Sequence, residues 1–191
     1  DNAGAVTTSA AHTVTVQAPG GGAGTILREF WTGIGGGAVS DIPVANAPSG
    51  TSQLTSFEGP SDWADSYGTR VRGYLYPPTT GSYTFWIAGD DNCALYLSTN
   101  DSAGAKQLIA SVPDWTNSRQ WTKFSQQTSA AITLTAGQRY YIEALQKEGG
   151  GGDNLAVAWQ GPGIAQQVIA GQYLAPTSGT PTNAAPTVAH S

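Results

Sequence analysis

The sequence predicts an all-β domain, a sandwich or barrel of antiparallel strands with short helical turns, from three observations. Apolar and polar residues alternate in several short segments, which is the period of a half-buried strand. Turn signals separate these segments about every 8–12 residues, the spacing of such folds. No window carries the 3.6-residue period of an amphipathic helix. The 25 glycines and 11 prolines in 191 residues suit a fold with many turns.

The strands are expected in segments that follow one another along the chain. Period-2 alternation places Cys93, Leu95 and Leu97 on one face of a strand, and Leu155, Val157 and Trp159 on one face of a later strand. A hairpin is expected with the Asp90–Asp91 pair at its tip, and a short helical turn is possible at 62–67. The expected strand segments are 24–36, 70–78, 81–89, 93–99, 131–146 (two strands joined by a turn), 154–163 and 171–176.

Flanking segments of different composition bound the domain. We divide the chain into an N-terminal flanking segment (1–23), which includes a short strand "HTVTV", a domain (24–176), and a Pro/Thr/Ala-rich linker (177–191). The sequence contains no methionine. We therefore expect a monomeric module from a longer, extracellular multidomain chain.

Charge and composition exclude several functions. The net charge is −5 and no basic cluster occurs, so nucleic acid is not an expected partner. No apolar run reaches the roughly 18 residues of a membrane span, so membrane insertion is not expected. The lone Cys93 excludes an internal disulfide, and the two histidines, His12 and His190, lie in the flanks. A histidine base is thus missing from the body, and we expect a non-enzymatic domain.

One catalytic alternative stays open at this point. A pair of carboxyl groups across a cleft can hydrolyse a glycosidic bond without histidine. Glu58, Glu143 and Glu148 are the candidates, and their relative positions do not follow from sequence.

Asp90 and Asp91 stand together although the chain has only 13 acidic residues. Neighbouring side chains of a regular strand point to opposite faces, so the two carboxylates converge only if a turn or a cis peptide swings both to one side. A hard cation such as Ca²⁺, which takes about 6–8 oxygen ligands, would hold such a pair together. The alternative is a solvated turn.

A glycine-rich loop at 149–152 follows the strand that ends near Gln146. Glycines let backbone carbonyls turn inward toward a cation, and polar side chains flank them. The alternative is a flexible loop. Of the six tryptophans, Trp115 is expected to be exposed because polar residues surround it, either as a sugar contact or as a loop anchor.

Three blocks of the sequence resemble the PA14 domain family. They are "GTRVRGYLYPPTTGSYTFWIAGDDNCALYLSTN", "AGQRYYIEALQKEGGGGDNLAVAW" and the closing "VIAGQYLAP", and "GTILREFWTGIGG" is similar to the opening strand. Within the family, the chain is most similar to calcium-dependent sugar-binding PA14 domains of large bacterial RTX (ice-binding) adhesins. The resemblance implies a β-sandwich that holds one Ca²⁺ through an Asp-Asp pair joined by a cis peptide.

The resemblance also implies a set of site residues. Asp90 and Asp91 match the Asp-Asp motif, and the second loop matches in position only. The expected metal ligands are Asp90, Asp91, the side chain of Gln146 (Glu148 as second choice) and the carbonyls of Gly150 and Gly152. The expected sugar contacts are Asp90, Asp91, Gln146, Lys147, Asp153 and Trp115.

The function that follows is a calcium-dependent lectin module of a bacterial surface adhesin. Vicinal hydroxyls of a terminal fucose-, glucose- or mannose-type sugar would complete the calcium shell, and the partners would be cell-surface glycans or polysaccharide. Two alternatives are kept: a structural PA14 spacer that uses calcium only for rigidity, and an accessory domain of a glycoside hydrolase.

Overall fold

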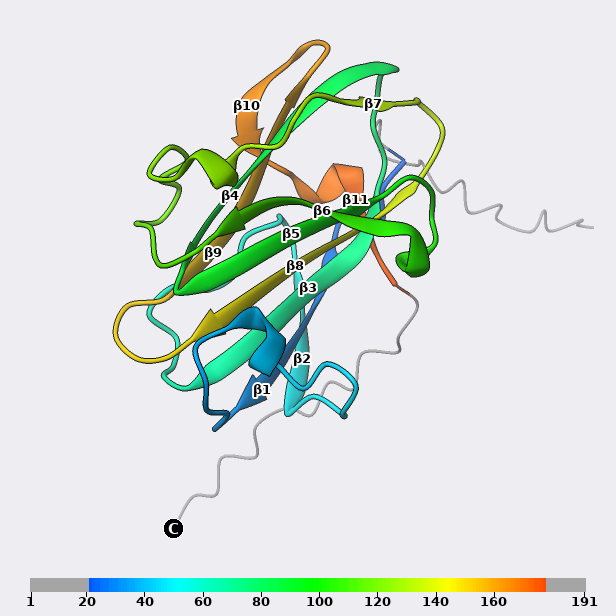
Figure 1. Cartoon of the computed structure of the whole chain (residues 1–191). Helices are drawn as coiled ribbons and strands as arrows, with labels where there is room; N and C mark the ends of the chain where they lie inside the picture. Colours follow the sequence, from blue (N-terminus) through cyan, green and yellow to red (C-terminus); the bar gives the residue numbers. More distant parts are fainter. Residues whose placement is uncertain (1–20, 178–191) are drawn as a thin grey trace, which may run out of the picture.

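A computed structural model describes residues 21–177 as two antiparallel β-sheets packed face to face (Figure 1). This confirms the all-β fold. The larger sheet has the order β2-β1-β3-β8-β5-β6, with β11 also paired to β3, and the smaller sheet has the order β10-β9-β4-β7. The strands are β1 (Ile26–Thr32), β2 (Gly50–Leu54), β3 (Tyr67–Leu75), β4 (Gly81–Asp90), β5 (Asn92–Ser98), β6 (Lys106–Val112), β7 (Ile132–Leu134), β8 (Tyr140–Glu148), β9 (Asn154–Gly161), β10 (Ile164–Val168) and β11 (Leu174–Pro176).

The alternation patterns identify most of these strands correctly. Each expected segment from 24–36 to 171–176 overlaps at least one strand, whereas β2, β6 and β10 were not foreseen. Residues 62–67 form no helical turn, and short 3-10 helices occur elsewhere, at η1 (Val39–Asp41), η2 (Ala103–Ala105), η3 (Ser125–Gln127) and η4 (Gly171–Tyr173). The expected "HTVTV" strand and most of both flanking segments lie outside the described residues, so the domain limits stay a prediction.

The expected hairpin at Asp90–Asp91 is wrong. Strand β4 pairs with β7 and β9 in the smaller sheet, whereas β5 pairs with β6 and β8 in the larger one. The chain therefore crosses from one sheet to the other at the aspartate pair. In the sequence, two apolar strands joined by a short polar link have the pattern of a hairpin. The local pattern does not specify which strand each of them pairs with, so a hairpin and a crossing between sheets look the same.

The core lies between the two sheets and is built from alternate residues of their strands. Cys93, Leu95 and Leu97 lie in it as predicted, together with Leu155, Val157 and Trp159. The Trp159 ring is fully buried and stacks on Tyr83 at a centroid distance of 5.2 Å. None of the helices among residues 21–177 is long and apolar enough to cross a membrane.

Strand β8 positions the end of the fold where the acidic residues gather. All nine of its residues are buried, because β3 and β5 flank it and the loop after β1 covers part of its outer face through Ile42 and Leu145. The register pairs Asn92 with Lys147 and Cys93 with Gln146. The last residues of β8 therefore lie beside the first residues of β5, next to Asp91.

Gly89 allows β4 and β5 to approach each other at this crossing. A Cβ atom there would lie 2.0 Å from Cys93 Sγ and 3.1 Å from the Asn154 carbonyl oxygen. We expect Gly89→Ala to lower the free energy of unfolding by roughly 1–3 kcal/mol, the usual cost of overpacking. Urea denaturation measures it.

A double-mutant cycle with Cys93→Ala tests the cause. In the Cys93→Ala background the sulfur is absent, so Gly89→Ala should cost clearly less than in the wild type. Equal costs in both backgrounds would show that the sulfur contact is not responsible.

Candidate functional site

Three carboxylates from two distant parts of the sequence meet at one end of the sandwich. Asp90 ends β4, Asp91 follows it through a cis peptide bond, and Glu148 ends β8. One carboxylate oxygen from each of the three lies within 4.8 Å of those of the other two. The β5–β8 register brings Glu148 to the aspartate pair, so the arrangement depends on long-range pairing. We call these three residues the acidic cluster.

Two members of the acidic cluster, Asp90 and Glu148, hold their protons more tightly than free carboxyl groups do. Burial, followed by the charge of Asp91, raises the pKa of Asp90 from 3.8 to about 6. Burial, followed by the charges of Asp91 and Asp90, raises the pKa of Glu148 from 4.5 to about 7. The charged groups that act on both are all carboxylates, with Asp153 and Asp65 adding to the effect on Glu148. A cation bound here would relieve this repulsion.

Buried oxygen atoms next to the cluster have no hydrogen-bond donor. Gln146 and Glu148 are 1% and 0% exposed, and Gln146 Oε1 and both carboxylate oxygens of Glu148 lack a partner. Gln146 Nε2 donates to the Asp90 carbonyl at 2.5 Å, which fixes the amide against the cluster. Unpaired buried acceptors are costly, and oxygen is the ligand type that Ca²⁺ prefers. The side chains present thus fit a calcium ion.

The glycine-rich loop is tied to the cluster and to the loop before β3. Gly149 N donates to Asp91 Oδ2 at 3.0 Å, and the Gly149 carbonyl accepts a bond from Ser66 N at 2.9 Å. Gly151 N donates to Asp65 Oδ1 at 3.1 Å. Gly150 and Gly152 lie exposed in the same loop, and their role as carbonyl ligands stays a prediction.

Like Gln146, two further expected sugar contacts are buried. Lys147 is 0% exposed, and its Nζ donates to the Glu148 carbonyl at 2.5 Å. Asp153 is 2% exposed, and its Oδ2 accepts bonds from Trp63 N at 2.6 Å and Ala64 N at 3.0 Å. Asp153 therefore fixes the loop before β3, and Lys147 does not reach solvent in this structure.

Trp115 lies beside the cluster and is exposed, as predicted. Trp115 is 42% exposed. Its backbone forms a bridge with Asp90, and the next residue, Thr116, donates its N–H to the Gly89 carbonyl at 2.7 Å. Lys123 Nζ lies 3.2 Å from the centre of the Trp115 ring and donates to the Trp115 carbonyl. The 113–124 loop thus forms one wall of the site.

The candidates for a hydrolytic carboxylate pair do not converge. Glu58 forms a two-pronged ion pair with Arg119, at 2.8 and 2.7 Å, on the surface. Glu143 is 2% exposed and engages Lys106 and Tyr141 on the outer side of the larger sheet. Glu148 lies in the acidic cluster. These three side chains therefore do not line a common cleft.

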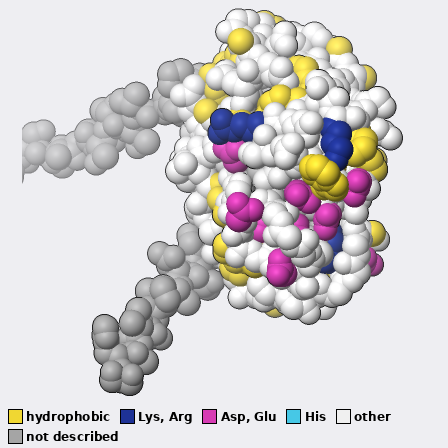
Figure 2. Space-filling model, turned by 90° about the vertical axis from the view of Figure 1, so that its left-hand side faces the viewer, with side chains coloured by type: hydrophobic (Ala, Val, Ile, Leu, Met, Phe, Trp, Pro, Cys, Tyr) yellow, Lys and Arg dark blue, Asp and Glu magenta, His cyan; other side chains and the backbone are white. Residues whose placement is uncertain are grey.

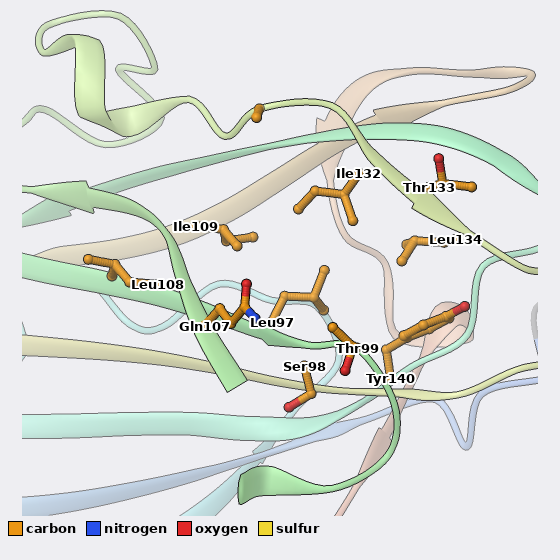
Figure 3. A pocket seen from close by; sticks show the side chains of 11 residues that line it. Leu97, Ser98, Thr99, Gln107, Leu108, Ile109, Ile132, Thr133, Leu134 and Tyr140 are labelled. Atoms are coloured by element: carbon orange, nitrogen blue, oxygen red, sulfur yellow. The ribbon is translucent and has the colours of Figure 1, made fainter. Parts of the chain in front are cut away.

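Acidic side chains gather on the face that carries the cluster, as Figure 2 shows. In Figure 1 this face is the left-hand side, where the β8–β9 loop lies. A hollow of about 200 Å³ adjoins Asp90 there and is lined by polar residues. A larger groove of about 410 Å³ lies elsewhere, between β6 and β7, and carries apolar and uncharged side chains from these strands and β5 (Figure 3). It contains no carboxylate, so the acidic site is the smaller hollow.

Sequence reasoning missed several residues that shape the site. Asp62, Asp65 and Ser66 reach it from the loop before β3, Thr116 from the 113–124 loop, and Asn154 from the start of β9. These are common turn residues and no local signal separates them from other turns. Their role follows from tertiary placement.

Comparison with known proteins places this chain in a family. The sequence model of the PA14 domain matches residues 46–179. The fold and the site define an antiparallel β-sandwich domain with an acidic cluster at one end. The chain belongs to the PA14 domain family. The resemblance seen in the sequence is therefore confirmed.

Curated relatives match over part of their length. N-acetyl-beta-glucosaminyl-glycoprotein 4-beta-N-acetylgalactosaminyltransferase 1 of Mus musculus is 38% identical over 111 residues, which cover 54% of this chain and 11% of that protein. Fibrocystin-L of Mus musculus is 37% identical over 84 residues, which cover 44% of this chain and 2% of that protein. The chain thus spans a small part of the curated relatives it matches, one of which is a transferase by name.

Solved structures share the fold. A PA14 sugar-binding domain from an RTX adhesin aligns with a TM-score of 0.61 at 15% identity, covering 80% of this chain and 98% of that one. The PA14 domain of the MpAFP antifreeze protein aligns with a TM-score of 0.61 at 15% identity, covering 92% and 100%. The epithelial adhesin 9 A domain from Candida glabrata, in complex with Galb1-4GlcNAc, has a TM-score of 0.55 at 11% identity, covering 78% and 85%.

The raised pKa of Glu148 predicts an unusual pH dependence of stability without metal. Folding favours the protonated form, so stability from this group is present at low pH and is lost as pH rises from about 4.5 to about 7. Replacing Glu148 by Gln removes that loss. In EDTA near neutral pH we expect Glu148→Gln to unfold with a free energy higher by on the order of 1–3 kcal/mol.

Urea unfolding at several pH values in EDTA measures the effect. The advantage of Glu148→Gln should shrink as pH falls from 7 and disappear well below 4.5, where the carboxyl group is protonated in both states. Glu58→Gln, at a surface ion pair, is the matched control. A pH-independent difference between Glu148→Gln and the wild type would contradict the role of charge repulsion.

Proposed function

We propose that this domain is a calcium-dependent carbohydrate-binding module, a lectin, of a bacterial surface adhesin. The observation that carries the proposal is the acidic cluster, in which three carboxylates and the buried, unpartnered oxygens of Gln146 and Glu148 converge. The shared fold with a PA14 sugar-binding domain from an RTX adhesin supports the choice of ligand and of setting.

The proposed calcium ligands come from both sides of the sheet crossing. Asp90 and Asp91 contribute from the crossing itself, and Glu148 and Gln146 from the end of β8, so Glu148 joins the aspartates directly rather than as a second choice. Carbonyls of Gly150 and Gly152 are further proposed ligands. When bound, Ca²⁺ accepts two neighbouring hydroxyl oxygens of a terminal sugar in place of water.

The residues of this chain supply the rest of the recognition. Asp90 and Asp91 are half-buried, so their carboxylates accept hydrogen bonds from sugar hydroxyls while holding the ion. The exposed ring of Trp115 offers an apolar surface beside them. The site is shallow, and we propose weak binding of single sugars that is strengthened by multivalent contact between cell-surface glycans and a longer, extracellular chain.

A structural spacer is the second candidate, favoured by the hydrogen bonds around Gly149. This residue links Asp91 to Ser66, so an ion at the cluster would also tie together the sheet crossing, the glycine-rich loop and the loop before β3. A spacer would melt at higher temperature with calcium and bind no sugar. We propose no catalytic residue, since Glu143 and Glu58 form ion pairs with Lys106 and Arg119 and do not converge with Glu148.

A glycan array with labelled protein, probed with calcium and then with EDTA, separates the candidates. We expect signals on glycans that end in sugars with vicinal hydroxyls, and loss of those signals in EDTA. Asp91→Asn should weaken calcium and sugar binding by about tenfold or more, because the amide is a neutral ligand. Asp101→Asn, at an exposed ion pair away from the site, is the control and should bind as the wild type does.

Two outcomes would count against the lectin function or its site. Calcium-induced stabilisation measured by thermal melting, with no glycan signal, would favour the spacer. Sugar binding that survives in Asp91→Asn at wild-type strength would contradict the proposed site.

A further inference from the structure

We propose that residues 12–16, the "HTVTV" segment, add to the outer edge of β6 as a further strand of the same molecule and close the open side of the sandwich. The segment has the period-2 pattern of a strand and lies outside the described residues. We call it the N-terminal strand. The inference does not depend on the acidic cluster or on the function proposed above.

Two strand edges on one side of the sandwich have no partner strand among residues 21–177. There β6 pairs with β5 alone, at one end of the larger sheet, and β7 pairs with β4 alone, at one end of the smaller sheet. The groove of about 410 Å³ lies between these two edges (Figure 3). The bulge in β6 falls between Leu108 and Ala110, so its regular, exposed edge is 106–108. Such an edge presents backbone N–H and C=O groups to which another strand can bind.

The groove is apolar, and none of its described lining residues is charged. Figure 3 shows the side chains of Ile109, Ile132 and Leu134 in the space between β6 and β7. Ile109 and Ile132 are only partly buried although they pack against the core. Leu108 is 57% exposed, the highest value for a large hydrophobic side chain among the described residues. Apolar surface that is left exposed along an unpaired edge is typical of a site for another strand.

The N-terminal strand matches the groove in pattern and in charge. Alternation places Val14 and Val16 on one face, toward the groove, and Thr13 and Thr15 on the other, toward solvent. Residues 2–24 contain no Asp, Glu, Lys or Arg. No charged side chain therefore loses its hydration when the segment covers the groove.

The described chain starts at the end of the sandwich where the groove opens. In Figure 1 this start, in blue, lies on the right-hand side, away from the β8–β9 loop. Ala23 N donates to the Leu174 carbonyl at 2.8 Å. Leu174 pairs with Leu75, and Leu75 pairs with Tyr140, which lines the groove. At about 4.8 Å per strand spacing, Ala23 lies roughly 15 Å from Tyr140. The chain from Val16 to Ala23 extends to about 23 Å, so the N-terminal strand reaches the groove.

The direction of entry selects β6 rather than β7 as the partner. A segment that reaches the groove from the Tyr140 end runs, from residue 12 to residue 16, toward that end. β6 starts at that end and runs away from it, since Lys106 pairs with Ser98 at the end of β5. β7 runs toward it, because Leu134 is followed by the turn that leads to Tyr140. The N-terminal strand is thus antiparallel to β6 and parallel to β7, and antiparallel pairing is the more stable of the two.

Hydrogen exchange of the full chain, followed by NMR for each amide and corrected for its intrinsic rate, tests the pairing. The amides of residues 12–16 that bond to β6 should exchange about tenfold or more slowly than those of residues 3–8. Residues 3–8 are the internal control, because they belong to the same flank and lie beyond the proposed strand. The slow exchange should be equal at low and high protein concentration, since the strand and the edge belong to one molecule.

Two double variants with the same added charge test the valine face. Val14→Asp with Val16→Asp sets two carboxylates against the apolar groove, so it should abolish the slow exchange and lower the melting temperature by about 2–4 °C. Thr13→Asp with Thr15→Asp is the matched control, which places the charges toward solvent and should keep most of the protection. Both should bind calcium as the wild type does, because the acidic cluster lies at the other end of β8.

A peptide supplied in trans locates the groove. In Val14→Asp with Val16→Asp the edge of β6 is vacated, so a fluorescent peptide of residues 10–18 should bind this variant and shift the NMR signals of 106–108. The wild type, whose own segment covers the edge, should bind the same peptide at least about tenfold more weakly.

Four results would overturn the proposal. Exchange in 12–16 as fast as in 3–8 would show that no strand forms. Protection that appears only at high concentration would assign the edge to the segment of a second copy. Equal loss of protection in both double variants would contradict the valine face. Equal binding of the peptide to the wild type and to the valine variant would show that the edge stays open to another chain.

Discussion

The pairing of β5 with β8 is the constraint on which the site depends. Its register places Asn92 opposite Lys147 and therefore brings the end of a fully buried strand alongside the aspartate pair. The core that holds this register is large and continuous between the two sheets. In a flexible loop the carboxylates of the acidic cluster would move apart. Here the strand register keeps their backbone positions fixed, and one oxygen of each carboxylate stays within 4.8 Å of the others.

Repulsion among these carboxylates is what gives the site its chemistry. Burial raises the pKa of Glu148 to about 7, and the neighbouring charges named above are all negative. The polar neighbours do not relieve this, since Gln146 turns its amide N–H to the Asp90 carbonyl and Lys147 turns its ammonium to the Glu148 carbonyl. A group of oxygens held close together with a negative excess is suited to a hard cation, and to ligands that bring hydroxyl donors.

The loop before β3 connects the cluster to the rest of the surface. Asp153 binds the backbone of Trp63 and Ala64, and the Trp63 ring packs on Arg28, whose guanidinium carbon lies 4.2 Å from the ring centre. Burial lowers the pKa of Arg28, while the charge of Asp153 opposes that shift. Asp153 thus fixes the loop before β3 and also lines the hollow next to the acidic cluster. Through this residue the glycine-rich loop, the hollow and the edge of the sandwich are held together.

The sequence by itself determined the sandwich class, most of the strands and the aspartate pair, because alternation with a period of two and adjacent acidic residues are local patterns. It also indicated an exposed Trp115 from its polar neighbours. Tertiary structure decided the rest. It replaced the expected hairpin by a sheet crossing, put Glu148 with Asp90 and Asp91, and turned Lys147 inward. These outcomes depend on which strands pair and in what register. The contacts involved join residues more than 50 positions apart, and the local sequence around one residue does not indicate which distant residue it will contact.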